Sequence, residues 1–143
     1  MIRASAARRA RVLLAAGAAA ALALCACRAK GFSLSGTVTV STPLHERAQR
    51  PNSVLFIIAK NMGGVPVAVR RVVNPGFPVF YRLGAPDLLL PGATPRGPFL
   101  IEVEENSRGD VGRPQPGDLA GRRPDPVPNG SRQADVVVNR VVR

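Results

Sequence analysis

The sequence has few of the residues on which enzyme and metal chemistry depend. It contains no tryptophan, one histidine, one tyrosine and two cysteines. Nucleophilic and acid–base catalysis need a base held beside a nucleophile, or a pair of carboxylates. The only imidazole, His45, lies in the polar stretch `TPLHERAQRPN`, which is typical of a solvated loop rather than a catalytic base or haem ligand. We therefore predict a protein that is not an enzyme and uses no cofactor.

The two cysteines, Cys25 and Cys27, are separated by one residue, a spacing that could suggest a metal site. A closed tetrahedral site needs at least two further soft or imidazole ligands, and His45 is the only other candidate. The spacing of Cys25 and Cys27 therefore does not indicate a metal site, and the two cysteines need another explanation.

The first 26 residues have the pattern of an export signal. A basic start is followed by an apolar run of 15 residues, Val12–Ala26, whereas a membrane-spanning helix needs roughly 20. We interpret residues 1–26 as a cleavable signal peptide, and a short transmembrane anchor remains the alternative. The basic residues are Arg3, Arg8, Arg9 and Arg11.

The stretch Leu24-Cys25-Ala26-Cys27 resembles the bacterial lipoprotein box. Cleavage before Cys27 would leave its sulfur and its new amino group to carry lipid, while Cys25 would leave with the signal. Two or more acyl chains give durable membrane anchoring where one does not. Residues 27–33 would then be the anchor and a short linker. Arg28, in place of aspartate after Cys27, favours the outer membrane, so we expect a periplasm-facing lipoprotein of the bacterial cell envelope.

Acidic residues are scarce, 9 against 20 basic ones, and the net charge is +11. After removal of the signal, with its four arginines and no acidic residue, the charge is 16 − 9 = +7. Such a surplus can indicate nucleic acid or an anionic membrane as partner. However, the arginines are scattered and aromatics make up only 4% of the chain. We therefore predict no nucleic-acid binding and a solvated surface that attracts acidic lipid or an acidic partner.

The mature chain has strand patterns throughout and no helical one. We predict an all-β fold of six to seven short strands, and a β-sandwich is the natural way to bury them. The predicted strands cover residues 31–40, 53–60, 65–73, 77–83, 98–105 and 134–142.

Several of these strands carry specific expectations. Residues 53–60 are continuously apolar and β-branched, which predicts a central strand buried on both faces. `NMGG` turns the chain into a second hairpin arm, where Pro66 must stand at the first residue or on an edge. We expect that arm to place Val67, Val69 and Val73 on one face. Two further expectations concern residues 98–105: Phe99, Ile101 and Val103 share one face, and Glu102 and Glu104 share the other and pair with arginine across strands.

Two segments are predicted loops. Residues 84–97 are rich in turn residues, and residues 107–132 contain ten prolines or glycines. The longer segment cannot bury enough surface to order itself alone, so we expect an ordered start and a loose end.

The order `SGTVTV…SVLFIIAKNMGGVPVAVRRV…LLLPG…RPQPGDLAG…VVVNRVV` resembles the C-terminal periplasmic Ig-like domain of the CcmI (CcmH/CycH) family of c-type cytochrome biogenesis factors. The similarity covers residues 34–142 in order, and its most specific pieces are residues 55–71 and 114–121. It implies an Ig-like β-sandwich over residues 34–143 and a link to haem ligation. Members of the family also carry two transmembrane helices and a tetratricopeptide domain, whose patterns this sequence lacks, and Leu88–Leu90 replace their Met-rich stretch.

The resemblance also implies a partner-binding surface on two loops. Its residues would be Leu88, Leu89, Leu90, Pro91 and Gly92, together with Pro116, Gly117, Asp118 and Leu119. Exposed leucines there would form an apolar patch of the kind that marks partner sites, although the leucines could equally cap the core.

Three functional hypotheses follow from the sequence. The first is a lipid-anchored, non-enzymatic interaction module accessory to cytochrome c maturation, with maturation proteins or apocytochrome as partners. The second is a structural envelope lipoprotein with no cytochrome role. A metal- or haem-handling protein is a third, weakened by the single histidine.

Overall fold

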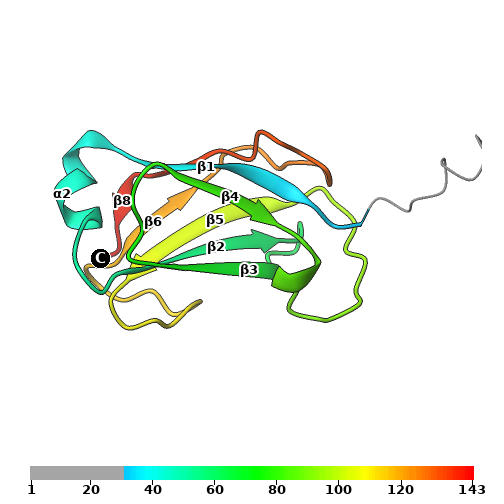
Figure 1. The fold of residues 1–143 in the computed structure, drawn as a ribbon, viewed down its shortest axis with the longest axis horizontal. Coiled ribbons are helices and arrows are strands. Elements are labelled where there is room, and N and C mark those ends of the chain that lie inside the picture. The colour runs from blue at the N-terminus through cyan, green and yellow to red at the C-terminus, as the bar shows by residue number, and fades with distance from the viewer. Residues whose placement is uncertain (1–30) are drawn as a thin grey trace, which may run out of the picture. The chain divides into compact units, whose positions relative to one another are not determined.

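The computed structural model describes residues 31–143, which form two β-sheets (Figure 1). Three strands make one sheet in the order β4-β1-β7, and five make the other in the order β3-β2-β5-β6-β8. The predicted all-β class is therefore confirmed. The strands are β1 (Leu34–Val40), β2 (Val54–Lys60), β3 (Pro66–Val73), β4 (Val79–Leu83), β5 (Leu100–Asn106), β6 (Leu119–Arg122), β7 (Val136–Val138) and β8 (Arg140–Val141).

The predicted signal peptide, residues 1–26, and the predicted lipidation site, Cys27, lie outside the described residues. Residues 31–143 group into one compact unit. Within that range, no helix has the length and apolar character needed to cross a membrane.

The main hydrophobic core combines inward-facing side chains of both sheets. Strict alternation along β4 buries Val79, Tyr81 and Leu83 and leaves the residues between them exposed, as the sequence predicts. Each fully buried apolar side chain contributes roughly 1.5–3 kcal/mol of transfer free energy. The largest fully buried core residues are Phe99, Leu34, Leu55, Ile57, Leu83, Ile101, Val38, Val103 and Val138.

Phe32 belongs to this core, as the predicted strand over residues 31–40 implies, and not to the predicted linker, residues 27–33. Its side chain is 8% exposed, and its ring meets that of Phe99 edge to face with a centroid distance of 5.3 Å. Such aromatic pairs stabilise beyond the area they bury. The folded domain therefore includes Phe32 as well as the predicted residues 34–143.

Strand β2 is buried on both faces, as its continuous apolar run predicts. It lies between β3 and β5, with Leu55, Ile57 and Ala59 in the main core. The alternate residues Val54, Phe56 and Ile58 form a second, smaller cluster together with Val69 on β3. The five-stranded sheet thus carries apolar side chains on its outer face as well as its inner one.

The predicted common face of Val67, Val69 and Val73 is wrong. The β2–β3 register shifts between Ala59 and Lys60, so Val67 packs against the main core while Val69 packs on the outer cluster. A β-bulge inserts one extra residue into a strand. The side chains beyond the bulge therefore point to the opposite face of the sheet from the one that strict alternation predicts. Pro66 begins β3 at the edge of the sheet, where its missing N–H costs no ladder hydrogen bond.

The predicted strand over residues 134–142 divides between the two sheets. Strand β7 pairs in parallel with β1, and β8 pairs antiparallel with β6. The chain approaches its neighbours so closely here that a Cβ on Gly121 would lie 2.0 Å from the Val137 carbonyl oxygen. On β1, a Cβ on Gly36 would lie 2.5 Å from the Ala134 carbonyl carbon. Glycine is needed at both positions for this contact.

Strand β6 lies inside the segment 107–132, which was predicted to be a loop. Its four residues, Leu119–Arg122, include none of the β-branched residues that signal a strand. With β6 and the divided C-terminal segment, residues 31–143 contain eight strands rather than six or seven.

Short helical turns replace two predicted loop stretches. A 3₁₀ turn, η1 (Thr42–Leu44), runs into helix α2 (His45–Ala48), and both Leu44 and Ala48 are buried. A second 3₁₀ turn, η2 (Ala85–Asp87), is tied to β3 by the Arg70–Asp87 ion pair at 3.1 Å.

Candidate functional site

The two sets of residues that the sequence assigns to one partner surface line different hollows. Leu89 of the first set lines a groove that contains none of Pro116–Leu119, and Gly117, Asp118 and Leu119 line a pocket that contains none of Leu88–Gly92. The longer loop reaches the groove through Val111 and Gly112 instead. The two sets therefore belong to two separate candidate sites.

In the first loop, only part of the leucine run is available to a partner. Leu88 is half-buried against the main core and forms a bridge to Ala68 on β3, which agrees with the core-capping alternative. Leu89 is 58% and Leu90 71% exposed, and Pro91 and Gly92 are exposed as well. The backbone N–H of Leu89 donates to the Val67 carbonyl at 3.0 Å, which fixes these side chains beside the edge strand.

Leu89 borders a largely apolar groove of about 320 Å³, here named the β2–β3 groove. Two of its lining residues, Ile58 and Val69, belong to the outer apolar cluster, and Val111 comes from the loop after β5. Val111 is 41% exposed. The groove is lined by Ile58, Lys60, Gly64, Pro66, Val69, Leu89, Glu104, Val111 and Gly112.

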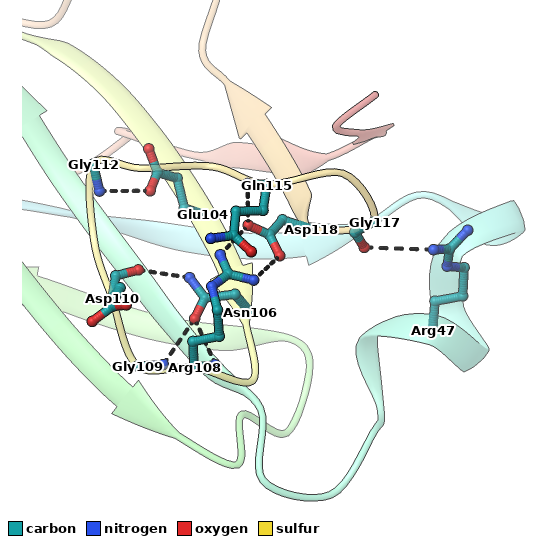
Figure 2. A network of polar contacts seen from close by, with 10 residues as sticks. All are labelled: Arg47, Glu104, Asn106, Arg108, Gly109, Asp110, Gly112, Gln115, Gly117 and Asp118. Atoms are coloured by element: carbon teal, nitrogen blue, oxygen red, sulfur yellow. Dashed lines mark hydrogen bonds and ion pairs between the residues drawn. The ribbon is translucent and has the colours of Figure 1, made fainter.

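The second loop, residues 107–118, is ordered by side-chain hydrogen bonds (Figure 2). Asn106 accepts from the backbone N–H groups of Arg108 and Gly109 at 3.1 and 2.9 Å and donates to the Asp110 carbonyl at 2.7 Å. Arg108 makes two hydrogen bonds to the Asp118 carboxylate, at 2.8 and 2.5 Å. The predicted ordered start of the long loop is therefore present. The predicted loose end is wrong, because β6 forms within the segment and Val127 and Phe99 exchange backbone hydrogen bonds at 2.8 and 2.9 Å.

Two predicted partner-binding residues of this loop are inaccessible. Asp118 is 7% and Leu119 4% exposed, whereas Pro116 and Gly117 are exposed. Leu119 begins β6 and points into the main core, because the loop ends one residue before it. Asp118 holds the loop instead, and the hydrogen bond from Arg108 keeps the pKa of its carboxyl below the usual value. The assignment of Asp118 and Leu119 to a partner surface is therefore corrected.

Replacing Asp118 with alanine is expected to loosen this loop and lower the free energy of unfolding by about 1–3 kcal/mol, since charge-assisted hydrogen bonds are lost. Because the folded-state pKa is lowered, the contribution is complete above the usual pKa of 3.8 and is lost as the pH falls through the folded-state value. Urea unfolding at neutral and strongly acidic pH measures the difference. The exposed Asp125 provides the control, and equal losses for D118A and D125A would contradict the assigned role.

A third feature, a polar pocket of about 80 Å³, was not predicted. Glu105 lines it, is 3% exposed, and finds no hydrogen-bond partner for either carboxylate oxygen among residues 31–143. Burial raises the pKa of Glu105 to about 7, against smaller lowering effects of the Ser53 hydroxyl and Arg50. The pocket is lined by Arg47, Arg50, Ser53, Glu105, Asn106, Ser107, Gly117, Asp118 and Leu119.

The sequence did carry a signal for Glu105. Alternate side chains of a strand point to the same face, so Glu105 points to the same side as Ile101 and Val103, which face the core. The predicted arginine pairing is confirmed for Glu102, because Arg122 pairs with it across the sheet at 3.2 Å and Lys60 forms a second ion pair with it. It is wrong for Glu104, which forms no ion pair with the described residues and accepts instead from the backbone N–H of Gly112 at 3.0 Å.

Metal-ligating residues do not gather in the part of the chain described. Residues 31–143 contain no group of three or more histidine, cysteine, aspartate or glutamate side chains placed to hold a metal ion. His45 is exposed on α2, as expected for a solvated histidine.

Comparison with known proteins finds no family model, no curated protein and no solved structure that matches the chain. The β2–β3 groove and the Glu105 pocket are two candidate sites among residues 31–143.

Proposed function

We propose that residues 34–143, with Phe32, form an Ig-like β-sandwich that binds a partner protein and catalyses no reaction. It would be displayed from a lipid anchor at Cys27 on the periplasmic side of the outer membrane. Two sheets around a shared core support the first part of this proposal. The lipoprotein-box pattern of residues 24–27 supports the second.

The β2–β3 groove is the observation that carries the binding role. A folded domain gains stability by burying leucine, yet Leu89 and Leu90 remain more than half exposed beside a groove that contains further apolar side chains. Apolar surface arranged in this way marks partner sites on soluble domains. The occupant would be apolar side chains of a partner protein, and the charge of the chain after removal of the signal, 16 − 9 = +7, favours an acidic one.

The resemblance to the CcmI family supplies the cellular role in this proposal. Its two most specific pieces, residues 55–71 and 114–121, include β2, the hairpin turn and the start of β6. We infer a function accessory to c-type cytochrome maturation, with a maturation protein or apocytochrome as partner. The competing function is a structural envelope lipoprotein that uses the same domain.

A haem-stained gel of membrane and periplasmic fractions from a strain lacking the gene tests this role. Loss of covalently bound haem, restored by the wild-type gene, is the expected result. An unchanged c-type cytochrome profile would overturn the maturation role and favour the structural lipoprotein.

The groove is tested by Leu89→Glu, which places a charge beside its apolar lining. We expect this variant to fail to restore covalent haem in the deletion strain while its free energy of unfolding stays within about 0.5 kcal/mol of wild type, as for other surface substitutions. Phe80→Glu is the matched control, because Phe80 is 80% exposed on β4 of the other sheet. A large fall in melting temperature for L89E would instead make Leu89 a structural residue.

A further inference from the structure

The Glu105 pocket contains several buried polar atoms without partners. Both carboxylate oxygens of Glu105, the hydroxyl of Ser53 and the Nε–H of Arg47 make no hydrogen bond of normal geometry among residues 31–143, although the Ser53 hydroxyl lies near enough to Glu105 to lower the pKa of its carboxyl. Buried polar groups in native proteins are almost always hydrogen-bonded, so their clustering here indicates a bound molecule. A volume of about 80 Å³ equals the liquid volume of two to three water molecules at roughly 30 Å³ each, so the bound molecule is small.

The charges around the pocket favour an anion. Arg47 on α2 and Arg50 after it both line the pocket, and neither forms an ion pair with the described residues. Asp118 is already neutralised by Arg108, at 2.5 Å. Two guanidinium groups against one carboxyl leave the pocket positive whether or not Glu105 is ionised.

We propose that this pocket binds a small oxyanion, the size of acetate or phosphate, between the two arginines, the Ser53 hydroxyl and the Glu105 carboxyl. Guanidinium groups match the oxygen spacing of carboxylates and phosphates and bind them in bidentate fashion. The site is distinct from the β2–β3 groove and does not depend on the partner-binding function proposed above.

Glu105 takes part as a donor in this site. With a proton from solvent, its O–H can donate to the anion, as can Arg47 Nε–H and the Ser53 hydroxyl, so each unpartnered group gains a partner. The pKa of about 7 makes the protonated form available near neutrality. Binding therefore consumes one proton per anion when Glu105 starts ionised, and affinity must fall as the pH rises.

The test is calorimetric titration of the full-length protein with sodium acetate and, separately, inorganic phosphate at constant ionic strength. We expect saturable binding with one anion per chain, and an acetate affinity about tenfold weaker at pH 8 than at pH 6 because one proton is taken up. The pH dependence is read from acetate, whose charge is constant over this range. Saturable binding of acetate, of phosphate or of both supports the site, and the anion that binds identifies whether the site accepts carboxylates, phosphates or both.

Three substitutions in the pocket and one control separate this site from general attraction to a basic protein. Arg50→Met is expected to weaken binding at least tenfold, whereas Arg96→Met removes the same charge from an exposed loop and should change nothing. Glu105→Gln keeps an N–H donor, so it should retain binding and abolish the pH dependence. Ser53→Ala, which loses a donor without altering charge, should weaken binding and provides a second variant if E105Q does not fold.

Several results would overturn the proposal. These are the absence of saturable binding of either anion at tens of millimolar, equal affinities in R50M and R96M, and tighter binding of acetate at pH 8. Circular dichroism of each variant establishes that a lost affinity reflects the site and not the fold.

Discussion

Gly121→Val is expected to lower the free energy of unfolding by more than about 3 kcal/mol, at the upper end of what overpacking costs. A Cβ at this position would lie 2.0 Å from the Val137 carbonyl oxygen and 2.7 Å from the Val137 carbonyl carbon. Both atoms are backbone of β7, so no flexible side chain can move aside. Either β6 or β7 must shift, and that shift breaks the pairing of β8 with β6 as well.

Thermal or urea unfolding of the purified variant measures this effect. Gly76→Val is the matched control, because Gly76 is exposed and a Cβ there meets no atom within 4 Å. If G121V were as stable as G76V, β7 could not lie against β6 as described. Gly36→Val provides an independent check at the other contact of this segment, where the Cβ would meet the Ala134 backbone.

Wild-type stability is expected to fall as the pH rises from about 4.5 to 8, the opposite of ordinary acid denaturation. The folded state raises the pKa of Glu105 from 4.5 to about 7, so the folded protein binds more protons than the unfolded chain in this interval. The contribution is complete below pH 4.5 and is lost as the pH passes through about 7. At about 1.4 kcal/mol per pKa unit, the loss amounts to at most about 3 kcal/mol.

Glu105→Gln removes the titration while keeping the shape of the side chain. We expect E105Q to match wild type near pH 4.5 and to be more stable at pH 8 by up to about 3 kcal/mol, or roughly 10 °C in melting temperature. The exposed Glu46 provides the control, and E46Q should follow wild type at every pH. Parallel pH profiles for wild type and E105Q, in buffer free of small oxyanions, would contradict this role for Glu105.

Side-chain alternation predicted those strands whose two faces differ in polarity. Strand β4 and residues 101–104 of β5 each have one apolar and one polar face, and the burial of their side chains follows this alternation. The segment 134–142 has valine on both faces, so its pattern is compatible with either sheet and does not reveal the change at Asn139. The close backbone approach permitted by Gly36 and Gly121 determines which sheet each part of this segment joins. That approach brings together residues that are far apart in the sequence.

The two candidate sites differ in how many of their residues could be predicted from the sequence. Leu89 and Leu90 were predicted as partner residues from a family resemblance, whereas the opposite wall of the groove, Val111, comes from a loop whose path only the fold determines. The Glu105 pocket joins α2, the start of β2 and the loop after β5, so no local pattern predicts it. Strand parity alone would have placed the Glu105 side chain inward.

Strand β1 depends on a segment distant in the sequence for one of its two edges. It lies in the middle of its sheet, between β4 and β7, and Val38 is paired with Val136. Until β7 docks, one edge of β1 therefore stays open. An open edge is a template for another chain, so a chain in which β7 has not yet docked is prone to aggregate. A chain truncated before Val136 would keep that vulnerability permanently.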